Sequence, residues 1–174
     1  FEGSDYIVAP SASCVGFVRN YYPDLFDNTA SHNEVKNIGN RIFEFTEFLI
    51  KILKIEKFGA SLPVKATYHD SCAGLRECKI KEEPRRLLNQ VQGLELVEME
   101  DNETCCGFGG TFAVKFDPIS IAMAEQKIGH AMDTGATHLI STDHSCLMHI
   151  DGVIKNKKLS LECMHIADVL ASGW

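Results

Sequence analysis

Residues 102–112 read Asn-Glu-Thr-Cys-Cys-Gly-Phe-Gly-Gly-Thr-Phe, with two adjacent cysteines followed by three glycines. Consecutive side chains of a regular strand point to opposite faces, so both sulfurs can meet one object only where the backbone turns sharply. Gly107, Gly109 and Gly110 supply that turn and let main-chain N–H groups approach an anionic group, which makes them candidate cofactor-binding residues. Adjacent thiolates fit poorly on one tetrahedral zinc but can bind different irons of one cluster. The stretch therefore favours a polynuclear centre.

The composition is that of a soluble globular protein of one domain or slightly more. The chain has 174 residues, of which 45% are hydrophobic and 24% are charged, as in ordinary globular domains. Its net charge of −7, without a basic cluster, argues against nucleic-acid or polybasic membrane binding. No apolar run is long enough for a membrane span, and no signal peptide opens the chain. Because the sequence starts at Phe1 and runs straight into a strand, we expect a fragment of a longer polypeptide.

Strand and helix patterns alternate along most of the chain. This alternation predicts an α/β fold with a mostly parallel sheet and helices on both faces. The expected strands are residues 6–9, 64–69, 94–99, 137–141 and 160–164, and the expected helices are residues 14–22, 34–58, 83–92, 118–134, 145–156 and 165–171. The helix over 34–58 rests on apolar residues at helical spacing with Gly59 as its end, and we expect a core helix there.

The seven cysteines are an odd number and lack the density of a disulfide scaffold, which predicts a reducing compartment and metal or redox use. Ligands of parallel sheets bind beyond the carboxyl ends of the strands. The cysteines that follow an expected strand are Cys14, Cys72, the Cys105–Cys106 pair and Cys146. We therefore expect these segments to converge on one edge of the sheet. Cys78 and Cys163 do not fit this pattern and are interpreted as small buried hydrophobes.

A short internal repeat relates the two ends of the chain. Residues 6–15 and 138–147 share an aliphatic strand end, a small polar turn, and then Ser-Cys followed by an aliphatic residue. This repeat predicts that residues 1–60 are the tail of a first cysteine module plus a long connecting helix, and that residues 61–174 are a complete second module. Cys14 would then belong to a first-module metal site.

The spacing of four cysteines is specific enough to indicate a family. Cys72, the Cys105–Cys106 pair followed by Gly107, and Cys146 are separated by 32 and 39 residues. This pattern resembles the cysteine-rich CCG domain that occurs in heterodisulfide reductases, in the iron-sulfur subunit of glycolate oxidase and in anaerobic glycerol-3-phosphate dehydrogenases. The runs that look most like the lactate-utilisation protein A group are Tyr68–Cys72, Cys105–Phe112, Cys146–Met148 and Met164–Ala167.

The resemblance implies a cytoplasmic bacterial electron-transfer subunit rather than a stand-alone enzyme, with any membrane association made through partners. Its partners would be two other subunits of a complex that oxidises L-lactate to pyruvate, or a related 2-hydroxy acid such as glycolate. Family members hold iron-sulfur clusters, including a non-cubane [4Fe–4S] type. The fullest family motif ends in Cys-x-x-Cys, whereas His149 stands at the second position here. An ordinary four-cysteine [4Fe–4S] cluster, a cluster completed by histidine, and a zinc site all remain open.

Four cysteines are the metal ligands that we predict, namely Cys72, Cys105, Cys106 and Cys146, with His149 as a possible extra ligand. His69 and His144 flank the expected site and are interpreted as supporting or surface groups. His165 follows a strand end, where it could face the same crevice or cap a helix.

Two rival functions remain open on these residues. One is a non-enzymatic, zinc-stabilised assembly domain in which the same cysteines hold a closed site. The other is a thiol-redox protein with a Cys105–Cys106 disulfide, which is disfavoured because vicinal disulfides are strained. No nucleophile–base pair, pair of catalytic carboxylates or Walker-type loop is recognisable, and residues 107–110 lack the context of a dinucleotide fingerprint.

Overall fold

Four parallel strands form the main sheet of the computed structural model, which describes residues 1, 3–55 and 57–173. In spatial order they are β4 (Glu95–Leu96), β3 (Lys65–Tyr68), β5 (His138–Ser141) and β6 (Glu162–His165). Each neighbouring pair is parallel. The predicted α/β fold with a mostly parallel sheet is therefore confirmed.

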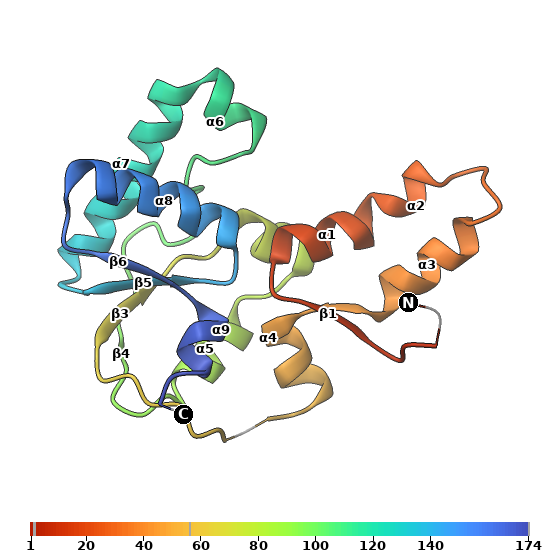
Figure 1. Cartoon of the computed structure of the whole chain (residues 1–174), viewed down its shortest axis with the longest axis horizontal. Helices are drawn as coiled ribbons and strands as arrows, with labels where there is room; N and C mark the ends of the chain where they lie inside the picture. Colours follow the sequence, from red (N-terminus) through yellow and green to blue (C-terminus); the bar gives the residue numbers. More distant parts are fainter. Residues whose placement is uncertain (2, 56, 174) are drawn as a thin grey trace.

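Helices cover both faces of this sheet (Figure 1). They are α7 (Asp117–Asp133) and α8 (His144–Lys157) on one face, and α5 (Glu82–Leu88) and α9 (Ile166–Leu170) on the other. Leu139 packs into the core under α7 and α8, whereas Ile140, the next residue of β5, packs into the core under α5 and α9. Both faces of the strand are thus apolar, as in a parallel sheet that is buried on two sides.

The strand order reverses between β3 and β5, because the chain first adds β4 on one side of β3 and then places β5 on the other. In open α/β sheets the crevice outside such a reversal point is where ligands bind. The loops that leave β3 and β5 carry Cys72 and Cys146. The topology therefore brings two predicted ligands to the customary ligand position of the fold.

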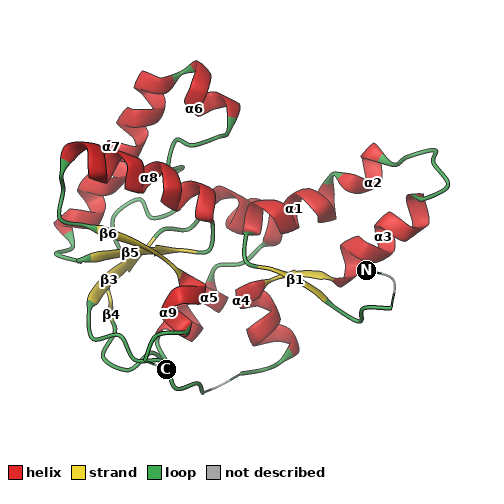
Figure 2. Ribbon diagram, viewed as in Figure 1, coloured by secondary structure: helices red, strands yellow, loops and turns green. Residues whose placement is uncertain are grey.

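The first part of the chain forms a separate two-stranded sheet beside the main sheet (Figure 2). Its elements are β1 (Ile7–Ala9), α1 (Ala12–Asn20), α2 (Tyr22–Leu25), α3 (His32–Arg41) and β2 (Ile42–Glu44), and β1 pairs in parallel with β2. We call residues 3–44 the N-terminal unit. Helix α1 packs on the π-helical turn η2 (Gly74–Cys78), where a Cβ on Gly16 would lie 2.3 Å from Cβ of Glu77. The close approach of these two segments requires glycine at position 16.

The expected helix over residues 34–58 is wrong. The segment instead contains α3, β2, a short helix α4 (Phe45–Glu47) and a π-helical turn η1 (Phe48–Ile52), while Glu56 lies outside the described residues. Strand β2 supplies the partner that β1 requires, and the buried Glu44 carboxylate accepts hydrogen bonds from the Thr46 and Glu47 amides, which starts a new helix. Apolar spacing alone does not reveal this non-local pairing.

The other predicted elements lie close to their expected positions, and two further short elements appear. Helix α6 (Thr111–Lys115) follows the glycines of the cysteine loop and precedes α7, and η2 follows Cys72. None of the helices in the described part of the chain is long and apolar enough to cross a bilayer.

Candidate metal centre

Four cysteine thiols from three loops form a continuous run at the carboxyl end of the sheet. Cys72 follows β3, Cys105 and Cys106 follow β4, and Cys146 lies in the first turn of α8 after β5. The thiol of Cys105 contacts those of Cys72 and Cys106, and the thiol of Cys106 also contacts that of Cys146. The structure thus brings together four of the cysteines that the sequence places after strand ends.

The four cysteines line an open cavity of ≈ 290 Å³. Gly109 and Gly110 line the same cavity, and Ser13, at the start of α1, lines it from the N-terminal unit. The Ser13 amide donates a hydrogen bond to Oδ2 of Asp143 at 3.0 Å, while Oδ1 of Asp143 caps α8 by accepting from the Ser145 amide at 3.1 Å. One buried carboxylate therefore joins the N-terminal unit to the helix that presents Cys146.

The contacts within the run favour thiolate at two of its positions. The Cys106 and Cys72 thiols donate to Cys105 and lower the pKa of Cys105, and the Gly107 amide adds a hydrogen bond to its sulfur at 3.4 Å. A hydrogen bond from Cys106 also lowers the pKa of Cys146 to about 6, against the opposing effect of burial. The pKa values of Cys72 and Cys106 are raised correspondingly. Metals bind the thiolate form, so the run is suited to hold a metal centre.

The imidazole of His69 is fully buried beside this run. Its backbone is held by β5, because the His69 amide donates to Ile140 O at 2.8 Å and Oγ of Ser141 donates to His69 O at 2.9 Å. A ring nitrogen of His69 and the sulfurs of Cys106 and Cys146 all lie within 4.8 Å of one another. His69 is therefore not a surface group, and its ring is close enough to two of the cysteines to be a candidate ligand. Its place at the end of β3, three residues before Cys72, was the available signal in the sequence.

The cysteine loop is clamped to α7 at Gly107, whose φ is +92°. A Cβ there would lie 2.5 Å from Ser120 O, and Oγ of Ser120 donates to Gly107 O at 2.8 Å. Only glycine combines this backbone conformation with such a close approach.

Comparison with known proteins agrees with this arrangement. The family model for the cysteine-rich CCG domain matches residues 66–151, which include all four cysteines of the run. Lactate utilization protein A 2 of Bacillus cereus (strain Q1) is 42% identical over 174 residues, which is 99% of this chain and 72% of the relative. The chain belongs to the lactate utilization protein A family. A further relative, lactate utilization protein A of Geobacillus kaustophilus (strain HTA426), is 44% identical and matches 98% of this chain and 71% of its own length.

A solved structure supports the fold alone. A hypothetical protein from Helicobacter pylori superposes with a TM-score of 0.56 at 11% identity, over 86% of this chain and 31% of that chain. At this identity the likeness carries no information on ligands.

The histidine that replaces the last cysteine of the motif faces α7. Nε2 of His149 lies 3.1 Å from Oγ and 3.3 Å from the carbonyl oxygen of Ser120, and its ring packs on Phe108. The role of His149 as a ligand in this family member stays a prediction. His144 is exposed. His165 caps α9 through Nδ1, and its Nε2–H donates to Pro10 O at 2.8 Å, so the capping role is the one observed.

The remaining cysteines lie apart from the run. Cys14 is exposed on α1 and does not line the cavity of the other four cysteines, although its neighbour Ser13 does, so the expected convergence of Cys14 with them is not observed. Its place in a first-module site stays a prediction. Cys78 is buried in the core between α1 and η2, as expected, and its thiol donates to Ala12 O at 3.3 Å. Cys163 is half-buried, and burial raises its pKa to about 12. Neither Cys78 nor Cys163 is among the residues that line the cavity of the run.

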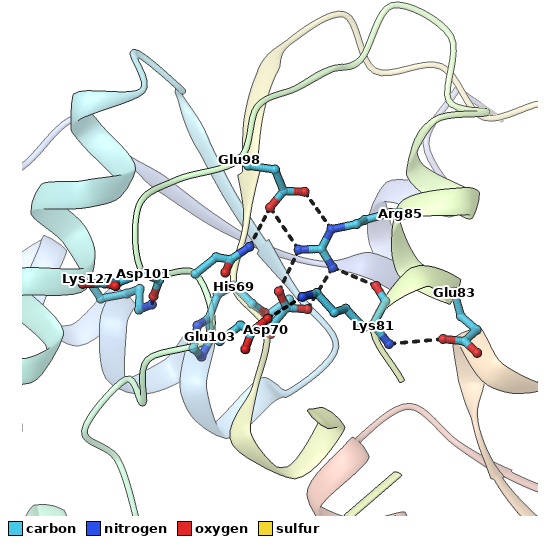
Figure 3. A network of polar contacts seen from close by, with 11 residues as sticks. His69, Asp70, Lys81, Glu83, Arg85, Glu98, Asp101, Glu103 and Lys127 are labelled. Carbon is cyan, nitrogen blue, oxygen red and sulfur yellow. Dashed lines mark hydrogen bonds and ion pairs between the residues drawn. The ribbon is translucent and has the colours of Figure 1, made fainter. Parts of the chain in front are cut away.

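A polar network that the sequence did not reveal supports the first two cysteine loops (Figure 3). Asp70, between His69 and Cys72, forms a bidentate ion pair with Arg85, with N–O distances of 2.9 and 2.7 Å. Arg85 also binds Glu98 at 2.7 and 3.0 Å, and its guanidinium lies over the Tyr68 ring. This pairing holds the Cys72 loop against the segment that leads to Cys105.

A buried lysine lies behind the same loops. Lys127 of α7 is 2% exposed, and its ammonium group donates to the carbonyl oxygen of Asp101 (Figure 3). Burial lowers the pKa of Lys127, whereas the charges of Asp101, Cys106, Asp70 and Cys105 oppose that effect. A cation at this position offsets negative charge that gathers on the thiolates.

Proposed function

We propose that the chain is an iron-sulfur electron-transfer subunit of a complex that oxidises L-lactate to pyruvate, or a related 2-hydroxy acid. The observation that carries the proposal is the run of four thiols from three loops at the reversal point of a parallel sheet. Relatives that match nearly the whole chain are named for lactate utilization, and this supports the substrate class.

The spread of the thiols favours a polynuclear centre over a single ion. Among the described residues, the potential ligands that lie within 4.8 Å of one another in a group of three or more are His69, Cys106 and Cys146. Cys72 and Cys105 continue the run beyond that group. A tetrahedral zinc needs all its ligands around one point, whereas the ligands of a cluster surround several metal atoms. The donor set therefore fits a [4Fe–4S] cluster.

The residues of this chain would bind the centre, balance its charge and control access to it. When bound, an iron-sulfur cluster accepts and donates single electrons. Four thiolates would leave excess negative charge, which Lys127 and the Gly107 amide are placed to offset. Oxidation of lactate to pyruvate releases two electrons and two protons, so the dehydrogenation itself would take place in a partner that accepts an electron pair.

The alternative function is a zinc-stabilised assembly domain. Its support is the compact group of His69, Cys106 and Cys146, which could hold one ion with a fourth ligand. In that case the metal would stabilise the fold of the module and carry no electrons.

We also propose the division into two cysteine modules, with residues 1–60 as the tail of the first and residues 61–174 as the second. The supporting observation is that Cys14 and Cys146 are each the third residue of a helix that follows a parallel strand. The predicted connecting helix is no part of this proposal.

The test is metal and acid-labile sulfide analysis with EPR spectroscopy on the full-length protein purified without oxygen. We expect iron and sulfide in the wild type and in the control variant Cys163→Ser, and a large loss of both in Cys105→Ser. Stoichiometric zinc without sulfide in the wild type would overturn the electron-transfer proposal in favour of the assembly domain.

A further inference from the structure

We propose that His69 is a nitrogen ligand of the metal centre beside the four cysteines, which gives the centre five protein donors, one more than an ordinary four-cysteine cluster has. This inference rests on the proposed iron-sulfur function and names the histidine that completes the site. The motif position in the sequence favours His149 for that role, so the structure leads to a different residue.

The first observation is that the imidazole of His69 lies against the Cys146 thiol and makes no hydrogen bond of normal geometry. The side chain is fully buried, and neither Nδ1 nor Nε2 has a hydrogen-bond partner of normal geometry. Buried polar groups are nearly always paired, because an unpaired one loses its hydration without compensation. The two unpaired nitrogens of this buried imidazole are therefore explained if one of them binds a metal that the neighbouring thiols also bind.

The second observation is the position of the ring. One of its nitrogens lies within 4.8 Å of the sulfurs of both Cys106 and Cys146. Both its backbone amide and its carbonyl oxygen are held by β5, through the hydrogen bonds to Ile140 and Ser141. His69 is thus presented from the rigid end of a central strand, as precise metal sites require.

The third observation separates His69 from His149. Nε2 of His149 is engaged by Oγ and the carbonyl oxygen of Ser120, and its ring packs on Phe108. Recruiting that nitrogen would break its contacts with Ser120, the residue that clamps Gly107 to α7. His69 can bind metal without giving up a hydrogen bond to any group outside the run of thiols.

The chemical consequence is a centre with less negative charge than one held by thiolates alone. A neutral imidazole that binds iron adds no negative charge, and histidine ligation raises the reduction potential of iron-sulfur centres. With Lys127 buried nearby, both features would make the centre a better electron acceptor.

The test is pulsed EPR on anaerobic full-length protein labelled with ¹⁵N-histidine, compared with unlabelled protein, in the paramagnetic state of the cluster. We expect a strong coupling to a directly bound histidine nitrogen. It should disappear in His69→Gln and persist in the matched control His149→Gln. The variant His69→Cys offers a thiolate in place of the imidazole, and we expect it to retain iron and sulfide, to lack the coupling, and to have a lower reduction potential.

The outcomes distinguish the two proposals. A cluster without strong histidine coupling in the wild type, or coupling that survives in His69→Gln or His69→Cys, overturns the role of His69 and leaves the electron-transfer function standing. A wild-type protein without iron and sulfide overturns both. Both variants at position 69 could lose the cluster. In that case the proposal is supported if the wild type shows histidine coupling and this coupling persists in His149→Gln and in His165→Gln.

Discussion

Cys14 and Cys146 occupy equivalent local positions, each the third residue of a helix that follows a parallel strand, yet their surroundings differ. Cys146 is buried, contacts the Cys106 thiol and has its pKa lowered to about 6. Cys14 is exposed and lies outside the run of thiols. The difference teaches that a strand–turn–helix unit presents a cysteine, but the segments that follow neighbouring strands supply the thiols that surround it.

The strongest test of this comparison is to replace Cys146 and Cys14 separately. We expect Cys146→Ser to remove the iron and sulfide held at the run of thiols, because it deletes one ligand and one of the two thiols that Cys106 contacts. Cys14→Ser should leave the content of the second module unchanged. Iron and sulfide analysis of the two variants, purified side by side without oxygen, checks the prediction. Equal losses in both would mean that the N-terminal unit supplies a ligand to the same centre.

Two glycines at positions of close backbone approach sharpen the comparison, namely Gly107 in the cysteine loop and Gly16 in the N-terminal unit. Gly107→Ala should lower the free energy of unfolding by roughly 4 kcal/mol and release metal, since it combines a disfavoured positive φ with a clash against Ser120 O. Gly16→Ala should cost about 2 kcal/mol by pushing α1 from Glu77, and should leave the iron content intact. Denaturant unfolding, with iron analysis of the same samples, measures both effects.

The control for these variants is Gly129→Ala in α7, where a Cβ meets nothing within 4 Å. It should be neutral or stabilise the protein by up to about 1 kcal/mol, because alanine favours helix. Normal iron content in Gly107→Ala would contradict the view that this clamp shapes the metal centre.

A titrating group in the N-terminal unit gives the third test. Burial raises the pKa of Glu44 from its ordinary value of 4.5 to about 7, against opposing hydrogen bonds from Thr46 and Glu47. The native state therefore binds the proton more tightly than the unfolded state, and stability is lost as pH rises from about 4.5 to 7. The loss contributed by Glu44 should reach about 3 kcal/mol by pH 8.

The variant Glu44→Gln should remove most of this pH dependence, while the exposed control Glu34→Gln should keep it. Unfolding free energies at pH 5 and pH 8, compared with the wild type, isolate the contribution of Glu44 from that of the cysteines. The same slope in Glu44→Gln and wild type would show that Glu44 is ionised at no cost in the folded protein.

Prediction from sequence succeeded where a local pattern determines the structure, and it failed where distant segments pair. Strands β3, β5 and β6 lie within two residues of their expected positions, because short apolar runs between turn signals identify buried strands. The helix over residues 34–58 failed because Ile42 and Glu44 are drawn into a strand by β1, more than thirty residues away along the chain. Local spacing contains no signal for that pairing.

For the metal centre, the sequence by itself determined that Cys72, Cys105, Cys106 and Cys146 would meet. Their positions after strand ends, combined with the parallel topology that strand–helix alternation dictates, place them at one edge. Only the tertiary structure decided that His69 is buried among them, that Arg85 secures Asp70, and that His149 turns to Ser120. These features depend on side-chain packing between distant segments, which periodicity and spacing do not encode.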